Sequence, residues 1–528
     1  MESSDGRAPL SSPEASEDGR EDRRAPQGWL TLFRVSVLLC AVVAVYGLLW
    51  PRSLASVAEL LTRRVFGAVD WFFLLAVSAF LVLCFWLALG SHGRMRLGAD
   101  DDRPEFSTAS WLSMLFAAGM GSGLMFWGVA EPVTHFTSPP VGAGSTPAAA
   151  RQAMVLTNFH WGLHAWGIYG VGALVLAYFG FRRRTASLAG APLRSVFRGP
   201  WVKPTAWTAD LVSVVAVAFG VAASVGMGVM QILGGLRTVA GLQTDSPLLT
   251  MGVLAVLMAC AMASATTGLQ RGIKWLSNLN MLIAILLLAF MLLSGPTGFL
   301  LRSFFTAAGD YVSGIFSLSL RLYPYQEIGN WFQSWTLTYF VWWIAWAPFV
   351  GIFVARISRG RTVREFVVGV LVAPTVFSML WFAVFGGVGI HEELFGPGGV
   401  GRLVQEDVTV ALFALFHRLP LSRLLDATAI LLVFVFLVTS VDSATFVLGM
   451  LTSGGSLDPP RSRRLIWGTG LGVLTAPLLL VGEVKVFKAV LVSGVLPYSL
   501  VMLVQVASLL RALRQDFRRG APGRERVT

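Results

Sequence analysis

The stretch "WWIAWAPFVG", residues 342–351, sets three tryptophans beside a proline and a glycine inside a strongly apolar segment. Tryptophan in a membrane helix usually lies at the headgroups, whereas Trp346 stands well before the next basic residue, Arg356. Pro348 and Gly351 are residues that break or loosen a helix. The stretch therefore predicts an interrupted membrane helix with aromatic rings deep in the bilayer.

The whole chain has the composition of a polytopic membrane protein. Of its 528 residues, 55% are hydrophobic and 13% are charged, and the mean hydropathy is +0.68. About twelve runs reach the roughly 20 apolar residues that a helix needs to cross the hydrocarbon. These spans are 29–50, 65–90, 107–130, 153–180, 208–236, 249–268, 273–296, 333–356, 366–390, 422–450, 464–482 and 485–511. We therefore predict an all-α protein of 12 transmembrane helices.

The basic residues follow the topology of such a protein. The net charge is +12, but the arginines gather in alternate loops, as in "RISRGRTVREF" at 356–366. Those loops are cytoplasmic if the N-terminus is cytoplasmic, which is the positive-inside pattern and not a nucleic-acid footprint. Summed over the loops, the pattern predicts cytoplasmic termini in the plasma (inner) membrane, although Arg52, Arg63 and Arg64 fall in an outer loop. No nucleic-acid partner is predicted.

The predicted spans divide into two units of five helices, at 107–298 and 333–511, and each unit opens with an interrupted helix. In the first unit, "FAAGMGSGLMFWG" at 116–128 has glycines at alternate positions, which one packing groove does not explain. Interrupted helices at corresponding places in two halves indicate the midplane binding site of a transporter. The other parts are a disordered cytoplasmic tail (1–28), two peripheral helices (29–106), an outer amphipathic helix (299–332) and a short basic cytoplasmic tail (512–528). A further amphipathic stretch is predicted at 401–418.

Aromatic residues indicate the kind of ligand. Two spans each carry a group of rings on one side of a helix: Trp161, Trp166 and Tyr169 in "FHWGLHAWGIY" (159–169), and Trp342, Trp343 and Trp346 in the opening stretch. Facing aromatic surfaces inside a membrane suit a quaternary ammonium, because ring quadrupoles hold its diffuse charge without a counter-ion. Trp331 and Trp335, near the outer end of their span, fit an interfacial aromatic belt instead.

The span at 422–450 supplies oxygen atoms. Thr439 and Ser440 are adjacent in "FVFLVTSVDSATF" (434–446), and carbonyls freed by the break in 107–130 would complete an oxygen shell suited to Na⁺. The alternative is that these hydroxyls bond back to their own helix. Asp442 is either a functional carboxylate or the partner of a loop arginine at the inner end.

Other polar residues carry less information. His160 and His164 are four residues apart on one helix face, but no acidic or cysteine partner is nearby, so packing or hydrogen bonding is favoured over zinc binding. Glu131, in "AEP", is predicted to end a helix before Pro132. No nucleophile–base pair, Walker loop or dinucleotide fingerprint is present, and we predict no enzymatic activity.

Three motifs resemble the betaine/choline/carnitine transporter (BCCT) family: "GMGSGLMFWGVAEP", "FHWGLHAWGIY" and "WWIAWAPFVGIFVARISRGRTVREF". The resemblance extends from the first predicted span to the last. It implies twelve helices, a leucine-transporter-like 5+5 inverted repeat, a homotrimer, and secondary transport of trimethylammonium solutes. The sodium-coupled glycine betaine carriers of the family are the most similar.

The same resemblance implies a set of site residues. Trp161, Trp166, Tyr169 and Trp343 correspond to a central aromatic box, while Trp342, Trp343 and Trp346 line the path along their span. The substrate site is also expected to include Gly119, Met120, Gly121, Gly123 and Phe349. Thr439, Ser440 and the carbonyls of Ala117, Met120 and Phe436 match one sodium site.

Several positions depart from the family pattern, and these departures bear on which ions and which solute the protein is expected to bind. Phe340 stands where the sodium-coupled carriers have another tryptophan, and Val217 and Val221 replace the two threonines of a second sodium site. Proton-coupled choline carriers have aspartate where Gly123 stands, so Gly123 favours a zwitterion that brings its own carboxylate.

The resulting hypothesis is Na⁺-coupled symport of glycine betaine or a related compatible solute, with Na⁺ as coupling ion and no other cofactor. Alternatives are a sodium-independent exchanger, proton-coupled choline uptake, and a membrane sensor that binds solute without transporting it. The arginines of the last predicted segment, "RALRQDFRRGAPGRERVT", also suit contact with anionic lipid.

Overall fold

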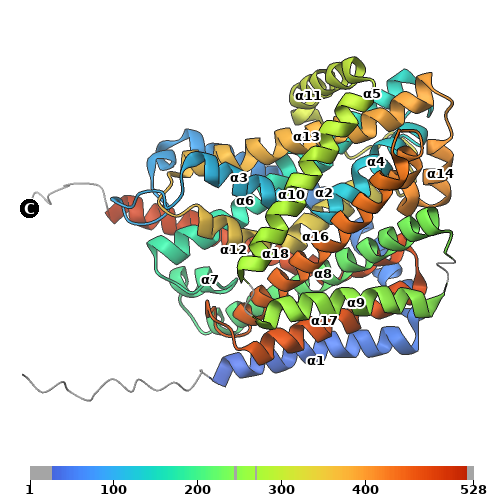
Figure 1. Cartoon of the computed structure of the whole chain (residues 1–528). Helices are drawn as coiled ribbons and strands as arrows, with labels where there is room; N and C mark the ends of the chain where they lie inside the picture. The colour runs from blue at the N-terminus through green and yellow to red at the C-terminus, as the bar shows by residue number, and fades with distance from the viewer. Residues whose placement is uncertain (1–26, 120, 243–245, 268–269, 520–528) are drawn as a thin grey trace, which may run out of the picture.

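The computed structural model describes residues 27–119, 121–242, 246–267 and 270–519. These residues form long helices packed into one bundle, shown in Figure 1, and their only β-type pairing is an isolated bridge between Arg96 and Thr362. The α-helices are α1 (Gln27–Leu49), α2 (Pro51–Leu89), α3 (Thr108–Gly119), α4 (Ser122–Thr137), α5 (Pro147–Trp161), α6 (Leu163–Ala177), α7 (Ala191–Val196), α8 (Val202–Ala240), α9 (Pro247–Thr267), α10 (Gln270–Ser294), α11 (Thr297–Ser319), α12 (Thr338–Ile357), α13 (Val363–Phe395), α14 (Val400–Glu406), α15 (Ala411–Phe416), α16 (Ser422–Leu451), α17 (Arg461–Val481) and α18 (Val484–Arg519). Short helical turns of other types are η1 (Ser91–Arg94), η2 (Tyr178–Arg182), η3 (Gln333–Leu337) and η4 (Val408–Val410).

The described residues contain one long apolar helix fewer than the twelve predicted spans. Within the described ranges, 11 helical stretches are long and apolar enough to cross a membrane. The span predicted at 107–130 is not among them because it is broken: α3 ends at Gly119, α4 begins at Ser122, and Gly121 between them is extended. The prediction of an interrupted helix at the alternating glycines is therefore confirmed.

Two other spans differ from the prediction. The span at 153–180 is two helices, because Gly162 leaves the helical conformation between α5 and α6. A Cβ atom on Gly162 would lie 2.4 Å from the carbonyl oxygen of Asn158, so only glycine fits there. The predicted interruption at Pro348 is wrong, since α12 continues through the proline from Thr338 to Ile357. Membrane helices tolerate proline where packing against neighbours and local adjustment satisfy the freed backbone groups.

The two segments outside the predicted spans have different environments. Helix α11 lies at the edge of the bundle in Figure 1, with Phe305 and Phe316 exposed on one side and Leu300 and Tyr311 buried on the other. This amphipathic helix begins at Thr297, two residues before the predicted range, and ends at Ser319, well before residue 332. The segment at 401–418 instead enters the protein, because every residue of α15 is buried.

Close helix packing surrounds the broken helix. Helix α4 packs against α5 and α13, and α12 packs against α6 and α8. A Cβ atom on Gly128 would lie 2.7 Å from Nε1 of Trp381, so glycine lets α13 approach α4. The indole of Trp381 donates a hydrogen bond to the carbonyl of Leu124 over 3.0 Å. These contacts hold the second half of the broken helix in place beside α13.

The basic loop between α12 and α13 also has a structural role. Arg361 is 2% exposed, lies 4.0 Å from the ring centroid of Trp111, and donates to the carbonyl of Phe106 over 2.9 Å. Thr362 and Glu365 form a capping box at the start of α13. The loop therefore ties the start of α3 to the α12–α13 turn. The division of the chain into two five-helix units stays a prediction.

Candidate functional site

The four rings expected to form an aromatic box meet around Trp343. Its ring centroid lies 5.5 Å from that of Trp161, 6.1 Å from Trp166 and 4.9 Å from Tyr169. Trp166 and Tyr169 meet edge to face at 5.5 Å. The exposed fractions of the four residues are 0 to 9%. Because neighbouring rings meet edge to face, their faces point in different directions. A cation against them would therefore contact several ring faces, away from water.

The break at Gly162 alters how this box is built. Trp161 is the last residue of α5, while Trp166 and Tyr169 belong to α6. The single-helix geometry predicted for the three rings is therefore wrong, although the three side chains still converge on Trp343. Trp343 is held by its own hydrogen bond, from Nε1 to the carbonyl of His160 over 3.0 Å.

The other aromatic residues of the opening stretch face a different helix. Trp342 donates from Nε1 to the hydroxyl of Ser224 on α8 over 3.2 Å. Trp346 contacts the ring of Phe349 edge to face at 5.3 Å, one turn further along α12. Trp342 and Trp346 thus lie on the α8 side of α12, and only Trp343 joins the box. The role of Trp342, Trp346 and Phe349 in substrate binding stays a prediction.

The glycines of the broken helix differ in their surroundings. A Cβ atom on Gly123 would lie 3.2 Å from Cη2 of Trp161, so Gly123 is directly against the box. Gly121 has no such neighbour within 4 Å, and Gly119 is the last residue of α3. Met120 lies outside the described residues. Of Gly121 and Gly123, whose surroundings the structure describes, Gly123 is the one that lies against the aromatic rings.

The predicted sodium site is described mainly on its α16 side. The Thr439 hydroxyl donates back to the carbonyls of Val435 and Phe436, at 3.0 and 3.1 Å. Its proton is therefore used within the helix, while its oxygen keeps lone pairs for a cation. Ala117 lies in the last turn of α3, where carbonyls have no partner within the helix. Ser440 is half-buried beside Thr439, and the assignment of these groups to Na⁺ stays a prediction.

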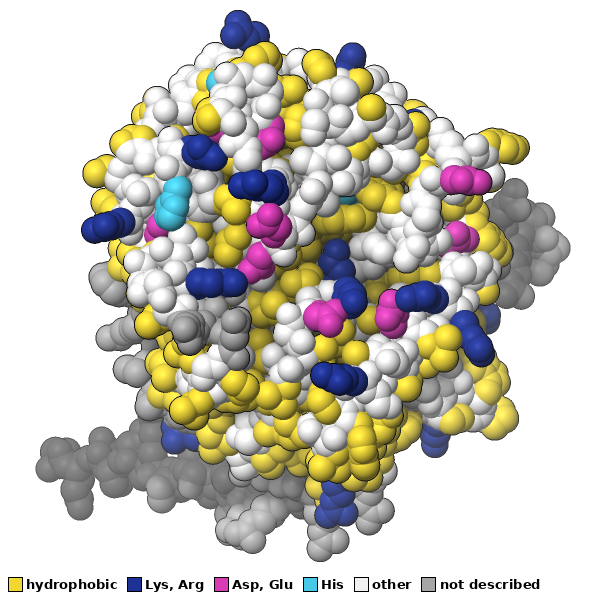
Figure 2. Space-filling view, turned by 90° about the vertical axis from the view of Figure 1, so that its right-hand side faces the viewer, with side chains coloured by type: hydrophobic (Ala, Val, Ile, Leu, Met, Phe, Trp, Pro, Cys, Tyr) yellow, Lys and Arg dark blue, Asp and Glu magenta, His cyan; other side chains and the backbone are white. Residues whose placement is uncertain are grey.

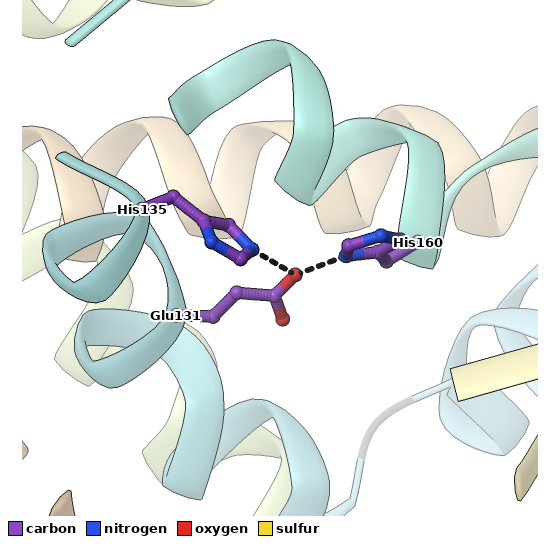
Figure 3. Close-up of side chains that lie close together, drawn as sticks. All are labelled: Glu131, His135 and His160. Atoms are coloured by element: carbon purple, nitrogen blue, oxygen red, sulfur yellow. Dashed lines mark hydrogen bonds and ion pairs between the residues drawn. The ribbon is translucent and has the colours of Figure 1, made fainter. Parts of the chain in front are cut away.

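A buried polar cluster lies next to the box and was missed by the sequence analysis. Figure 3 shows Glu131 between His135 and His160, all three fully buried. Glu131 Oε1 lies 2.6 Å from Nδ1 of His160 and 3.5 Å from Nε2 of His135. Glu131 is therefore inside α4 and not at its end, and His160 does have an acidic partner. The predicted helix end at Glu131 is wrong because α4 continues through Pro132 to Thr137 and places the carboxylate opposite α5, whereas the hydrogen-bonding role predicted for His160 is confirmed.

This cluster is bonded to the box. Glu131 Oε2 accepts a hydrogen bond from Nε1 of Trp161 over 2.7 Å, and His160 Nε2 lies 2.9 Å from the hydroxyl of Thr336. The same residue, His160, provides the carbonyl that holds Trp343. Two walls of the box are thus oriented by one buried carboxylate and its histidine.

The cluster also contacts two rings that the sequence analysis assigned to the membrane interface. Trp331 and Trp335 lie 5.1 and 4.5 Å from the ring centroid of His135. Trp335 additionally meets Trp127 edge to face at 5.6 Å. Both half-buried rings thus contact side chains of α4, and their place at the membrane interface stays a prediction.

Three possible metal-ligating side chains meet in this cluster, since the ligand atoms of Glu131, His135 and His160 lie within 4.8 Å of one another. Two ligands of one tetrahedral zinc ion at about 2.0 Å would be separated by roughly 3.3 Å. The 2.6 Å between Glu131 and His160 is instead a hydrogen-bond distance. As arranged, the three groups form a hydrogen-bonded support for the box.

Comparison with known proteins identifies the family. Residues 31–518 match the family described as "BCCT, betaine/carnitine/choline family transporter". The chain belongs to the betaine/carnitine/choline transporter family. It is 40% identical to the glycine betaine transporter OpuD of Bacillus subtilis (strain 168), over 92% of this chain and 95% of that protein. It is also 38% identical to the ectoine/hydroxyectoine transporter of Virgibacillus pantothenticus, over 94% of this chain and 98% of that protein. A glycine betaine transporter of Acinetobacter baylyi is 38% identical over 92% of this chain and 73% of its own length.

The protein is therefore a multi-pass membrane transporter of this family and not an enzyme. Figure 2 views the transporter from the side on which α14 lies in Figure 1. Near the middle of this face is a hollow with hydrophobic side chains inside it and acidic and basic side chains around it.

Asp442 has a structural partner in the transporter. Its carboxylate lies 3.3 Å from the guanidinium of Arg464, in the first turn of α17, and accepts a hydrogen bond from Ser264 over 3.1 Å. Of the two alternatives from the sequence, pairing with a basic residue next to a loop is the one that the structure contains. The pair joins α16, α17 and α9.

We expect Asp442→Asn to lower the thermal stability of the transporter without altering any effect of Na⁺ on solute uptake. The loss of a partly buried, charge-assisted contact should destabilise the fold by about 1 to 3 kcal/mol. Thermal unfolding of the purified protein in detergent measures this as a lower apparent Tm. Glu483→Gln is the matched control, because the Glu483–Lys485 pair is exposed and should contribute little. A large change in sodium dependence with unchanged stability would contradict the structural role.

We expect Glu131→Leu to raise the KM for the transported solute about tenfold, because losing the acceptor of a buried N–H costs roughly 1 to 3 kcal/mol. Glu131→Gln keeps a carbonyl acceptor for the indole of Trp161 and should recover most of the affinity. Initial rates of solute uptake give KM and kcat for each variant. A merely structural role would lower the amount of folded protein or kcat equally in both variants, so rescue of KM by glutamine is the distinguishing result.

Proposed function

We propose that the protein is a Na⁺-coupled symporter of glycine betaine or a related compatible solute. The aromatic box of Trp161, Trp166, Tyr169 and Trp343 is the observation that carries this proposal. It offers ring faces in a buried site where a trimethylammonium group needs no carboxylate partner from the protein. The names of two similar proteins, both glycine betaine transporters, support the same substrate class.

The surroundings of the box favour a zwitterion over a simple cation. Gly123 adds no side chain against Trp161, so the protein provides no counter-charge at that point. One buried donor of the box, Nε1 of Trp166, has no hydrogen-bond partner among the described residues. Donors of this kind suit the carboxylate that a betaine carries itself.

Sodium coupling is supported by the oxygen groups at the end of α3 and on α16. A break in a membrane helix frees carbonyls, and half-helix ends beside a hydroxyl-bearing helix are the usual site of a coupling Na⁺. Thr439, with its lone pairs, and the last turn of α3 have these properties.

The test is uptake of labelled glycine betaine into proteoliposomes, with and without an inward Na⁺ gradient. We expect accumulation only with the gradient. Equal uptake in both conditions would exclude coupling to Na⁺.

A sodium-independent exchanger is the second candidate, and a specific observation favours it. Val217 and Val221, which replace the two threonines of a second sodium site, are both 1% exposed and offer no side-chain oxygen. Counterflow of betaine in the absence of Na⁺ would support this candidate, and complete dependence on Na⁺ would exclude it.

The substrate can be identified by measuring the uptake of several solutes. One relative is an ectoine/hydroxyectoine transporter, so ectoine joins glycine betaine, carnitine and choline in the same gradient assay. Zwitterions should be accumulated and choline should not.

We further propose that the termini are cytoplasmic in the plasma membrane, that the transporter is a homotrimer, and that the basic end of α18 contacts anionic lipid. The oligomer is tested by the mass of the purified protein in detergent with the detergent contribution subtracted. A monomeric mass would contradict the trimer. Uptake in liposomes with and without anionic lipid tests the contact, and equal rates would argue against it.

A further inference from the structure

The side chain of Lys488 lies in a second group of aromatic rings beside the box. Its ammonium nitrogen is 4.2 Å from the ring centroid of Trp335, 4.7 Å from Trp127 and 5.9 Å from Tyr339. We name these three rings the lysine cage. They come from α4 and from the consecutive elements η3 and α12, while Lys488 comes from the start of α18, so three segments far apart in sequence meet here.

The ammonium has no acidic partner within ion-pair distance among the described residues. It donates to the carbonyl of Ser334 over 3.2 Å, and its neighbour Lys485 is the one that pairs with a carboxylate, Glu483, at 2.8 Å. A lysine ammonium has three donors. Ring faces and one carbonyl contact this charge directly, the buried carboxylate of Glu131 attracts it at longer range, and donors remain for a further acceptor.

The lysine cage is connected to the aromatic box by Tyr339. The ring of Tyr339 meets Trp161 edge to face at 5.6 Å and Trp127 at 5.9 Å, and it stacks with Trp335 at 6.2 Å. Tyr339 is 3% exposed, so it separates the two groups of rings inside the protein. A charge in the cage is thus one aromatic ring away from a ligand against Trp161.

An aromatic cage that already holds a cation affects simple cations and zwitterions differently. A solute that is only a cation, such as choline, meets a like charge on ring faces that would otherwise attract it. A zwitterion meets the same repulsion at its ammonium end, but its carboxylate can accept from the free donors of Lys488. The difference between the two solutes is therefore set by the lysine.

We propose that Lys488 is a specificity-determining residue, whose ammonium occupies the cage of Trp127, Trp335 and Tyr339 and selects zwitterionic solutes over simple cations. This inference rests on the proposed function for the identity of the solutes. On the predicted topology the start of α18 is on the outer side, so selection would precede entry into the box.

The first test compares uptake of labelled choline and glycine betaine by Lys488→Ala and Lys488→Arg. Alanine should raise the choline-to-betaine ratio of initial rates about tenfold, since it removes both the repulsion and the carboxylate partner. Arginine keeps the charge and should leave the ratio near that of the unchanged protein. Lys485→Ala is the control on the same helix, because its side chain is exposed and paired with Glu483.

A second test does not depend on transport. Tetramethylammonium is titrated into the purified full-length protein while indole fluorescence is recorded. Lys488→Ala opens the cage and should bind tetramethylammonium about tenfold more tightly than the unchanged protein, whereas Lys488→Arg and Lys485→Ala should not. Equal affinity in all four proteins would overturn the role of Lys488, whatever the uptake assay shows. Tighter binding by Lys488→Ala with no betaine uptake by any of the proteins would contradict the proposed substrate while leaving Lys488 as the occupant of the cage.

Discussion

Trp343→Leu is expected to weaken binding of glycine betaine about 30-fold, the largest loss for any single ring, because a desolvated cation–π contact is worth about 2 kcal/mol. Trp343 is the ring that contacts the other three walls, at 4.9 to 6.1 Å. Leucine is apolar and helix-compatible, so it removes the ring face without adding a polar group to a site that is 9% exposed. Titration of the remaining indole fluorescence with betaine, together with KM from uptake, measures the change.

The control must be a tryptophan outside the site. Trp331 is unsuitable because its ring lies 5.1 Å from that of His135, in the cluster that supports the box. Trp71 on α2 is 51% exposed, and Trp71→Leu should change affinity by less than about twofold. Similar losses in both variants would mean that the rings are structural and that the box does not bind the solute.

The parts of the fold that depend on local sequence were predictable. Long apolar runs gave the spans, and the alternating glycines at 119, 121 and 123 predicted the break between α3 and α4. Pro348 shows the limit of local rules, because the surrounding helices keep α12 intact through it. Gly162 is the opposite case: a single glycine in this apolar run does not predict a break, and the backbone conformation that brings a Cβ at this position against the Asn158 carbonyl is visible only in the structure.

The candidate site likewise has one part that was predictable from the sequence and other contacts that depend on how the helices pack. The ring types and their spacing predicted two facing groups of rings, the family resemblance implied the four residues of the box, and the structure brings those four together. Glu131 could not be connected to His160 and Trp161 from the sequence, since the contact depends on how α4 and α5 pack. Lys488 is further still from its cage in sequence, and only the packing of α18 against α12 brings it there. The one local indication is the residue type of Glu131, because a carboxylate in an apolar membrane helix usually has a polar partner inside the protein.

Gly123→Asp is expected to reverse the preference between solutes. A Cβ atom at this position would lie 3.2 Å from Cη2 of Trp161, so an aspartate would place its carboxylate against the box. That charge would attract the cation of choline and repel the carboxylate of betaine, and each effect is worth a few kcal/mol in a dry site. We expect the choline-to-betaine ratio of kcat/KM to rise about 100-fold.

Gly123→Ala separates charge from size. Alanine brings the same Cβ atom within 3.2 Å of Trp161 but adds no charge, so it should lower the uptake of both solutes together and leave their ratio nearly unchanged. Because the neighbour is a ring edge that must shift by a few tenths of an ångström, the loss should be modest. If alanine and aspartate change the ratio equally, crowding and not charge controls the selection, and the argument that Gly123 admits a zwitterion by withholding a carboxylate fails. If only aspartate changes it, the charge at this one position of the broken helix decides which class of solute the box accepts.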